Sequence, residues 1–312
     1  MVEPPDGERR NGRVTAVALS GFAMMALLSA IALVMWLLRG GAVPTDTAEP
    51  GHGPSASMSA STPADPAPSV VAAEPWRLVR VGDPVTVTTE FTDPGANDTH
   101  TCDIDWDDGA RASGPAPGDV CGGTHAYRHA GMYTIRSVVT DDDGGVLRVP
   151  GVLVVVYDPA AGAARGNGRL KPGQAGGFDF TARYPLRSAT VPEGDVSFAL
   201  PSRLNLDLRN HQHLDWLVVT PDGKIAIKGT AESAPGHKVG FLLYGYHGCP
   251  AGQRDGCQPG PDRLRMVVWD HTNGPVPPGI SPLYDDRPGM PFDIDQADPL
   301  AIDQGAILIS SS

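Results

Sequence analysis

Acidic residues alternate in one short segment of the chain, and this pattern could bind a calcium ion. Asp103, Asp105 and Asp107 would lie on one side of an extended strand, because side chains alternate between the two faces of a strand. Carboxylate oxygens are the ligands that Ca²⁺ prefers. A second acidic turn holds Asp141 and Asp143 and could supply further oxygens. These five aspartates are therefore the candidate calcium ligands.

The same segment differs from an EF-hand loop at two positions where that loop is strict. Gly109 comes one residue late, and Gly114 stands where the loop requires a bidentate glutamate. Two interpretations stay open: a calcium site of another kind, with Ca²⁺ as the one cofactor, or turn carboxylates that are merely solvated.

A histidine-rich segment could bind zinc. On a strand, His211, His213 and Asp215 would point to one side, and imidazole and carboxylate groups are ordinary zinc ligands. The alternative is that Asp215 and Trp216 simply begin a strand, and this is the interpretation we adopt.

Motifs for nucleophilic catalysis and phosphate binding are absent from the sequence, which has no Gly-x-Ser-x-Gly, no phosphate-binding glycine loop and no His-Glu-x-x-His. We therefore expect no catalytic residues and no enzymatic activity. Two carboxylates could still converge, as in a glycoside hydrolase. A hydrolase directed at the cell wall, with the C-terminal domain as its catalytic part, stays the alternative.

The four cysteines form two local pairs. In an oxidising compartment, this placement predicts the disulfides Cys102–Cys121 and Cys249–Cys257. Zinc binding by all four thiolates is the weaker interpretation, because neither pair has the usual two-to-four-residue spacer.

Polar and aromatic residues surround the second cysteine pair. Tyr246 and His247 precede the loop, and Arg254 and Asp255 lie inside it. Binding residues tend to lie on loops that a rigid scaffold holds in place. We name these four as candidate exposed binding contacts, against the alternative of a plain solvent loop.

An uncharged and mostly apolar run covers residues 14–38. As a helix it would be roughly 37 Å long, enough to cross a hydrocarbon core of about 30 Å. Arg9, Arg10 and Arg13 precede the run, so the positive-inside rule predicts a cytoplasmic N-terminus and an exported C-terminal part. We expect a single-pass cell-membrane protein with this helix as its membrane contact; a cleaved signal peptide is the rival interpretation.

The chain of 312 residues has a formal net charge of −12. Nucleic acids and anionic membrane surfaces both require a basic face on their partners. The charge therefore argues against nucleic acid as a partner.

Composition divides the rest of the chain into segments. Residues 39–75 are rich in Pro, Ala and Ser and predict a disordered linker after the cytoplasmic stub at 1–13. Residues 158–170, rich in Ala, Gly and Asn, predict a hinge. The expected folded domains are residues 76–157 and 171–312.

Short alternating runs separated by turn residues fill the first folded segment. Val85–Phe91, Met132–Val138 and Val149–Val156 predict strands of an antiparallel β-sandwich. Five motifs follow one another there: Phe91-Thr92-Asp93-Pro94-Gly95, Asp105-Trp106-Asp107-Asp108-Gly109, Thr124-His125-Ala126-Tyr127, Gly131-Met132-Tyr133-Thr134-Ile135 and Asp141-Asp142-Asp143-Gly144-Gly145.

This ordered set resembles the PKD domain, an immunoglobulin-like module of bacterial surface proteins and secreted enzymes. The Trp-to-Gly turn is shorter here than in the family, where it also contains an aromatic residue and a glycine. The resemblance implies a β-sandwich and a role in protein or carbohydrate interaction. Independently, the residue types predict that Trp106 fills the core and that Tyr127 and Tyr133 pack on it or tie a loop.

About eight further strands are expected over residues 171–312, which suits a second β-sandwich or a barrel-like domain. The segment from Asp215 to Asp270 is similar to a β module that often follows PKD repeats in exported bacterial proteins. The sequence thus predicts an all-β ectodomain behind one transmembrane helix. Its expected function is adhesion or display, with a cell-surface protein or polysaccharide as partner.

Overall fold

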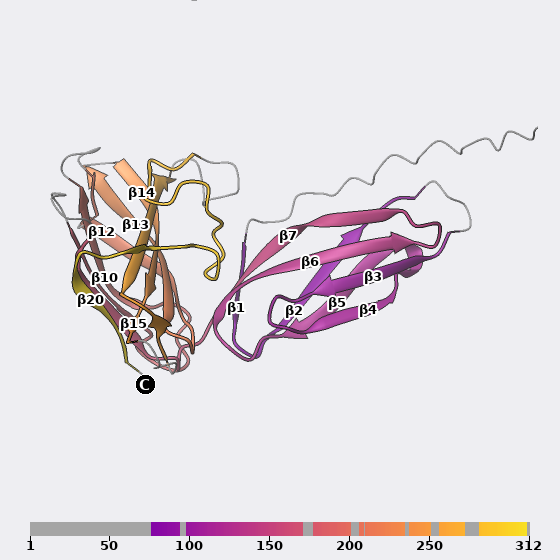
Figure 1. The fold of residues 1–312 in the computed structure, drawn as a ribbon, viewed down its shortest axis with the longest axis horizontal. Coiled ribbons are helices and arrows are strands. Elements are labelled where there is room, and N and C mark those ends of the chain that lie inside the picture. The colour runs from indigo at the N-terminus through magenta and orange to yellow at the C-terminus, as the bar shows by residue number, and fades with distance from the viewer. Residues whose placement is uncertain are drawn as a thin grey trace, which may run out of the picture. The chain divides into compact units, whose positions relative to one another are not determined.

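The computed structural model describes residues 76–93, 98–170, 177–200, 206–208, 210–234, 237–250, 256–271 and 281–310. The expected transmembrane helix (14–38) and linker (39–75) lie outside these residues. Among the described residues, no helix is both long and apolar enough to cross a membrane. Strands make up nearly all of their regular structure, so the all-β prediction is confirmed (Figure 1).

The N-terminal domain is built from two sheets. Five strands form one sheet in the order β1-β7-β6-β3-β4, and β2 pairs with β5 in the other. The first strand, β1, runs parallel to β7, with Trp76 opposite Leu153. The elements are β1 (Trp76–Arg80), β2 (Pro84–Glu90), β3 (His100–Asp105), β4 (Arg111–Pro115), the 3₁₀ turn η1 (Pro117–Asp119), β5 (Val120–Ala126), β6 (Gly131–Asp141) and β7 (Val146–Tyr157).

Alternation along β3 sends one set of side chains into the core of this domain. Cys102, Ile104 and the following Trp106 are at most 6% exposed. The disulfide from Cys102 reaches Cys121 on β5 and therefore joins the two sheets. The hairpin partner of β3 is β4, so the bridge does not close this hairpin.

The predicted role of Trp106 as a core residue is confirmed, and two tyrosines surround its turn. The hydroxyl of Tyr127 donates a buried 3.0 Å hydrogen bond to the carbonyl of Trp106. The ring of Tyr127 stacks on that of Tyr133, with 4.2 Å between centroids. Tyr133 in turn donates to the carbonyl of His129. The tyrosines thus fix the chain on both sides of the turn.

The C-terminal domain is a second sandwich. Its sheets have the orders β11-β10-β9-β8-β20 and β12-β13-β14-β17-β18, with β19 also paired to β17. Its elements are β8 (Ala163–Arg169), β9 (Gly177–Arg183), β10 (Glu193–Leu200), β11 (Leu206–Asp207), β12 (Asn210–Val219), β13 (Lys224–Ala234), β14 (His237–Tyr246), β15 (Gly248–Cys249), β16 (Gln258–Pro259), β17 (Arg263–Asp270), β18 (Tyr284–Asp285), β19 (Leu300–Ala301) and β20 (Gln304–Ser310).

Residues 158–170, the predicted hinge, are mostly a strand. β8 pairs with both β9 and β20 and so lies inside the five-stranded sheet. Its glycines gave the segment the composition of a linker. Gly166 is required because a Cβ atom there would come within 2.6 Å of the Phe180 ring. The hinge prediction is wrong over 163–169, since small residues here make room for large ones opposite.

The six-stranded sheet is buried on both faces. Towards the other sheet, its side chains join a core that includes Phe241, Leu243 and Met266. The opposite face joins a separate cluster through Tyr244 and Trp269. This double burial explains why β14 and β17 read as nearly continuous apolar runs.

The second cluster draws residues from three places. The N-terminal domain contributes Ala130, Met132 and Val155, while Ile294 and Ala297 come from a covering segment, residues 284–301. Between the N-terminal domain and this segment, the hydroxyl of Thr134 also donates a 2.9 Å hydrogen bond to Asp293. The two sandwiches therefore share a buried apolar contact.

A buried arginine on β17 holds the covering segment. Arg265 is 0% exposed and makes a two-pronged ion pair with Asp285, at 3.0 and 2.9 Å. Its guanidinium also donates to the carbonyls of Met290, Pro291 and Ala297. All of these guanidinium contacts are made to residues of the covering segment. They compensate a charge that would otherwise be costly to bury.

Candidate functional site

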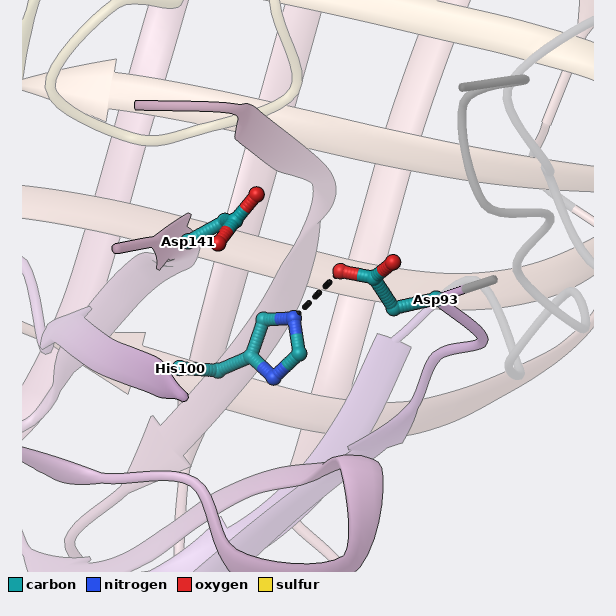
Figure 2. A group of neighbouring side chains, drawn as sticks. All are labelled: Asp93, His100 and Asp141. Atoms are coloured by element: carbon teal, nitrogen blue, oxygen red, sulfur yellow. Dashed lines mark hydrogen bonds and ion pairs between the residues drawn. The ribbon is translucent and has the colours of Figure 1, made fainter. Parts of the chain in front are cut away.

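Three titratable side chains meet where β3 begins and β6 ends. Asp93 follows β2, His100 opens β3, and Asp141 closes β6 opposite His100. The Nε2 atom of His100 lies 2.6 Å from Asp93 Oδ2. Figure 2 shows the ring of His100 turned towards Asp93, with the Asp141 carboxylate close by. One potential ligand atom from each residue lies within 4.8 Å of the others.

The imidazole of this group is well enclosed. The His100 side chain is 7% exposed, and its Nδ1 atom lies 3.9 Å from the carboxylate of Asp119. Its ring also meets the edge of Phe91 at 4.8 Å. The histidine is therefore held by acidic groups on both ring nitrogens.

A second group shares Asp141 and contains only carboxylates. Asp98, Asp141 and Asp142 also place one oxygen each within 4.8 Å of the others. Desolvation and the neighbouring charges of Asp141 and Asp93 raise the pKa of Asp98. A hydrogen bond from the Thr99 backbone amide, 3.0 Å long, lowers the pKa of Asp142.

These two groups bring four carboxylates and one imidazole together at one end of the N-terminal domain. The all-oxygen group suits a hard divalent cation such as Ca²⁺, because Ca²⁺ takes carboxylate and carbonyl oxygens. The group with His100 has a nitrogen ligand and suits a borderline metal better. Without a metal, the same contacts tie the loop after β2 to the end of β6.

The five aspartates named from the sequence are not brought together. Asp141 lies in both groups just described, but Asp103, Asp105 and Asp107 belong to neither. The alternation fails because β3 ends at Asp105 and Asp107 has a positive φ of 66°. Asp143 is exposed, and its amide donates to Asp141 Oδ1 at 3.1 Å.

The carboxylates of the Asp-Trp-Asp-Asp-Gly motif instead stabilise its own turn. Asp105 accepts from the amide of Asp107, and Asp107 accepts from the amide of Thr134 at 2.8 Å. Asp108 accepts from His125 Nε2 at 2.7 Å. Asp103, which precedes this motif, is exposed and has no such role among the described contacts.

The sequence missed Asp93, Asp98, His100 and Asp142. The pairing of β3 with β6, which sets His100 opposite Asp141, would have indicated this group. The sequence does not reveal that pairing, because the paired residues are 31 or more positions apart and β3 has too few apolar residues to be recognised as a strand.

Two of the four predicted binding residues near the second disulfide, Tyr246 and His247, have structural roles. Tyr246 is 7% exposed, and its hydroxyl donates to the carbonyl of Ile294, so it is a core residue rather than an exposed contact. Burial raises its pKa to about 12. His247 donates from Nδ1 to the carbonyl of Ile307 at 2.7 Å. Arg254 and Asp255 lie outside the described residues.

The second disulfide itself is present as predicted. Cys249 is bonded to Cys257, and the short strands β15 and β16 pair on either side of it. The bridge closes the segment that follows β14.

The histidine-rich segment lies on β12 and shows no zinc-like convergence among its described side chains. His213 is exposed, and its Nδ1 atom is 3.2 Å from Asp215 Oδ1. The other oxygen of Asp215 is paired with Lys228. This arrangement is an ion pair between neighbouring strands. The strand itself begins at Asn210, so the interpretation that Asp215 and Trp216 begin it is wrong.

The protein consists of two sandwiches whose strands are mostly antiparallel. The N-terminal sandwich has Trp106 in its core and a disulfide between its sheets, and these features define an immunoglobulin-like, all-β protein. Residues 65–150 match the family described as PKD domain, and the resemblance drawn from the motifs is confirmed. The match covers most of the N-terminal sandwich and ends within β7, before the C-terminal domain.

Other comparisons add little. No curated protein matches the sequence. Among solved structures, the fibronectin(III)-like modules of Clostridium thermocellum CbhA match at 12% identity, covering 55% of this chain and 88% of theirs. The TM-score is 0.23, which does not establish a common fold.

Proposed function

We propose that the chain is a membrane-anchored, extracytoplasmic protein that binds a cell-surface protein or polysaccharide and does not act as an enzyme. The observation that carries this proposal is the PKD domain over residues 65–150, a module used for interaction and adhesion. The apolar run at residues 14–38 supports the anchor, and the two disulfides suit an oxidising compartment.

The contact between the two sandwiches supports a role in presentation. Met132 and Val155 of the N-terminal domain pack with Trp216 and Trp269 of the other domain, and all four are at most 4% exposed. Binding loops on such a unit are held in fixed geometry, which lowers the entropy lost on binding.

The orientation is tested in intact cells that produce the full chain with a C-terminal tag. We expect a membrane-impermeant protease to remove the tag and the four cysteines to resist thiol labelling until they are reduced. A protected tag together with free thiols would contradict the anchored, exported topology.

Binding is tested with the purified chain and isolated cell envelopes, with and without EDTA. We expect saturable retention of the chain by the envelopes, and competition by an excess of untagged chain. Release of soluble sugar or peptide from the envelopes would favour the hydrolase alternative instead. Equal retention of an unrelated acidic β-sandwich would contradict specific binding.

A further inference from the structure

A shallow depression lies on the solvent side of the five-stranded sheet in the C-terminal domain. Its volume is about 590 Å³, and β8, β9, β10 and β20 all contribute to it. Ala163 and Gly194 are the small residues of its floor, beneath which Ala182 packs in the core, while Arg165, Thr181 and Ser310 supply polar side chains. A volume of this size is typical of small-molecule sites.

The depression contains two arginines, of which one is paired with a carboxylate. Arg183 is paired with Glu193, through Nε and Nη2 at 2.9 and 2.6 Å from the same oxygen. Arg165 lies opposite Thr181 in the sheet and is exposed. In the part of the chain that the structure describes, the guanidinium of Arg165 makes no ion pair or hydrogen bond, and only the backbone of this residue is paired in the sheet. The depression thus has one uncompensated positive charge on a chain whose net charge is −12.

A free guanidinium selects for anions of particular geometry. Its planar donors match the two oxygens of a carboxylate or phosphate, which can be bound by two parallel hydrogen bonds. The hydroxyl of Thr181 can both donate and accept, and the hydroxyl of Ser310, which donates to the carbonyl of Ala163 at 3.4 Å, can still accept. The small floor residues leave room for a ring to lie flat above the sheet.

A peptide fits this surface less well. Extended peptides gain most of their affinity by pairing with a free sheet edge. Here β8, β9 and β10 are paired on both sides, and the edge strand β20 contributes only Ser310 to the depression. A ligand over β8, β9 and β10 must therefore bind through side chains, which favours a compact polar molecule.

We propose that Arg165 binds the anionic group of an acidic sugar, a carboxylate or a phosphate, while Thr181 and Ser310 bind its hydroxyls. This site lies in the C-terminal domain and does not depend on the function proposed for the whole chain. Failure of envelope binding or of export would leave it untouched.

The test uses the purified full chain and saturation-transfer NMR with calorimetric titration. The probes are glucuronate, glucose 6-phosphate, neutral glucose and an acidic hexapeptide. We expect one or both anionic sugars to bind in competition with salt, and glucose to bind at least about tenfold more weakly, because charged hydrogen bonds are lost. The preference between the two anions then identifies carboxylate or phosphate.

Variants separate the site from the rest of the sheet. Arg165→Gln is expected to weaken binding of the anionic sugar at least about tenfold. Arg169→Gln removes a charge from the same strand and face but outside the depression, and is expected to change the affinity less than about twofold. Thermal unfolding midpoints of both variants should equal that of the parent chain.

Several results would overturn the proposal. Failure of both anionic sugars to bind would do so, as would equal affinity for glucose. An equal loss of affinity in Arg165→Gln and Arg169→Gln would mean that the anion responds to the overall charge of the sheet and not to a site at Arg165. Tighter binding of the hexapeptide than of either sugar would overturn the assignment of a sugar ligand.

Discussion

The hydroxyl of Tyr127 is a single group on which the geometry of the Trp106 turn depends. It is buried and donates to the carbonyl of Trp106 in the core. Burial, and then the nearby negative charge of Asp108, raise its pKa, so it keeps its proton and remains a donor at physiological pH.

We expect Tyr127→Phe to lower the free energy of unfolding by roughly 1–2 kcal/mol, because the carbonyl of Trp106 loses its hydrogen bond in a buried place. Tyr133→Phe is the matched control, since its hydroxyl bonds to His129 at an exposed position. Urea unfolding measures both variants. Equal losses would contradict the importance of burial at Tyr127.

Asp286 gives stability a dependence on pH. Desolvation raises its pKa to about 7, although the amide of Met266 and the charge of Arg265 act in the opposite direction. The folded state therefore binds this proton more tightly than the unfolded state. Stability from this group is greatest at low pH and is lost as the pH rises from about 4 to 7.

The variant Asp286→Asn should therefore be more stable than the parent above pH 7, by on the order of 2 kcal/mol, and should show little gain at pH 4.5. Chemical unfolding at pH 4.5 and pH 8 measures the difference. Asp303→Asn, at an exposed position, serves as control. A gain that is the same at both pH values would argue against burial as the cause.

At the scale of elements, alternation of apolar residues was a sound guide wherever one strand face is buried. The strands expected at Val85–Phe91, Met132–Val138 and Val149–Val156 all form. Alternation did not predict β8, because its buried positions hold alanine and glycine, which give the segment the composition of a linker. It also could not predict that the covering segment buries Tyr246, since this contact joins residues 48 positions apart.

Candidate sites were harder to predict than strands. Asp141, one of the candidate calcium ligands, lies in both acidic groups, but its partners there depend on strand register and on the end of β2. Local spacing favoured Asp103, Asp105 and Asp107, although a turn with positive φ breaks their common side. Alternating residues share one face of a strand only as far as the strand extends.

The inter-sheet disulfide is the covalent link of the N-terminal sandwich. Its cysteines are 19 residues apart in sequence. Replacing both Cys102 and Cys121 by alanine should lower stability by about 3 kcal/mol in the chain-entropy account. The same change at Cys249 and Cys257, which are 8 residues apart, should cost about 2.5 kcal/mol. Thermal unfolding compares the pairs, and no loss in the first would contradict its role as a link between sheets.

At the scale of the whole molecule, the shared apolar cluster predicts that the two sandwiches unfold together. Trp106 reports on the N-terminal domain, and Trp216 and Trp269 report on the cluster. A contact of this kind couples domains whose cores are otherwise separate.

Met132 is the residue to change, because it lies on β6 and is 1% exposed within the cluster. Met132→Asp buries an unpaired charge, and we expect the single unfolding transition to split into two. Val146→Asp, at a 55% exposed position of the same domain, should keep one transition. Fluorescence and circular dichroism during urea unfolding measure this. Two transitions in the parent chain would contradict the coupling.

The parallel pairing of β1 with β7 has a mechanical consequence. Trp76 starts β1 and pairs with Leu153, and β7 ends at Tyr157, where the chain passes to the next domain. Tension between the two ends of this sandwich would therefore pull the adjacent strands lengthwise in opposite directions. Their backbone hydrogen bonds would share the load at once instead of opening one after another, so the domain should resist stretching far better than a hairpin opened from its end.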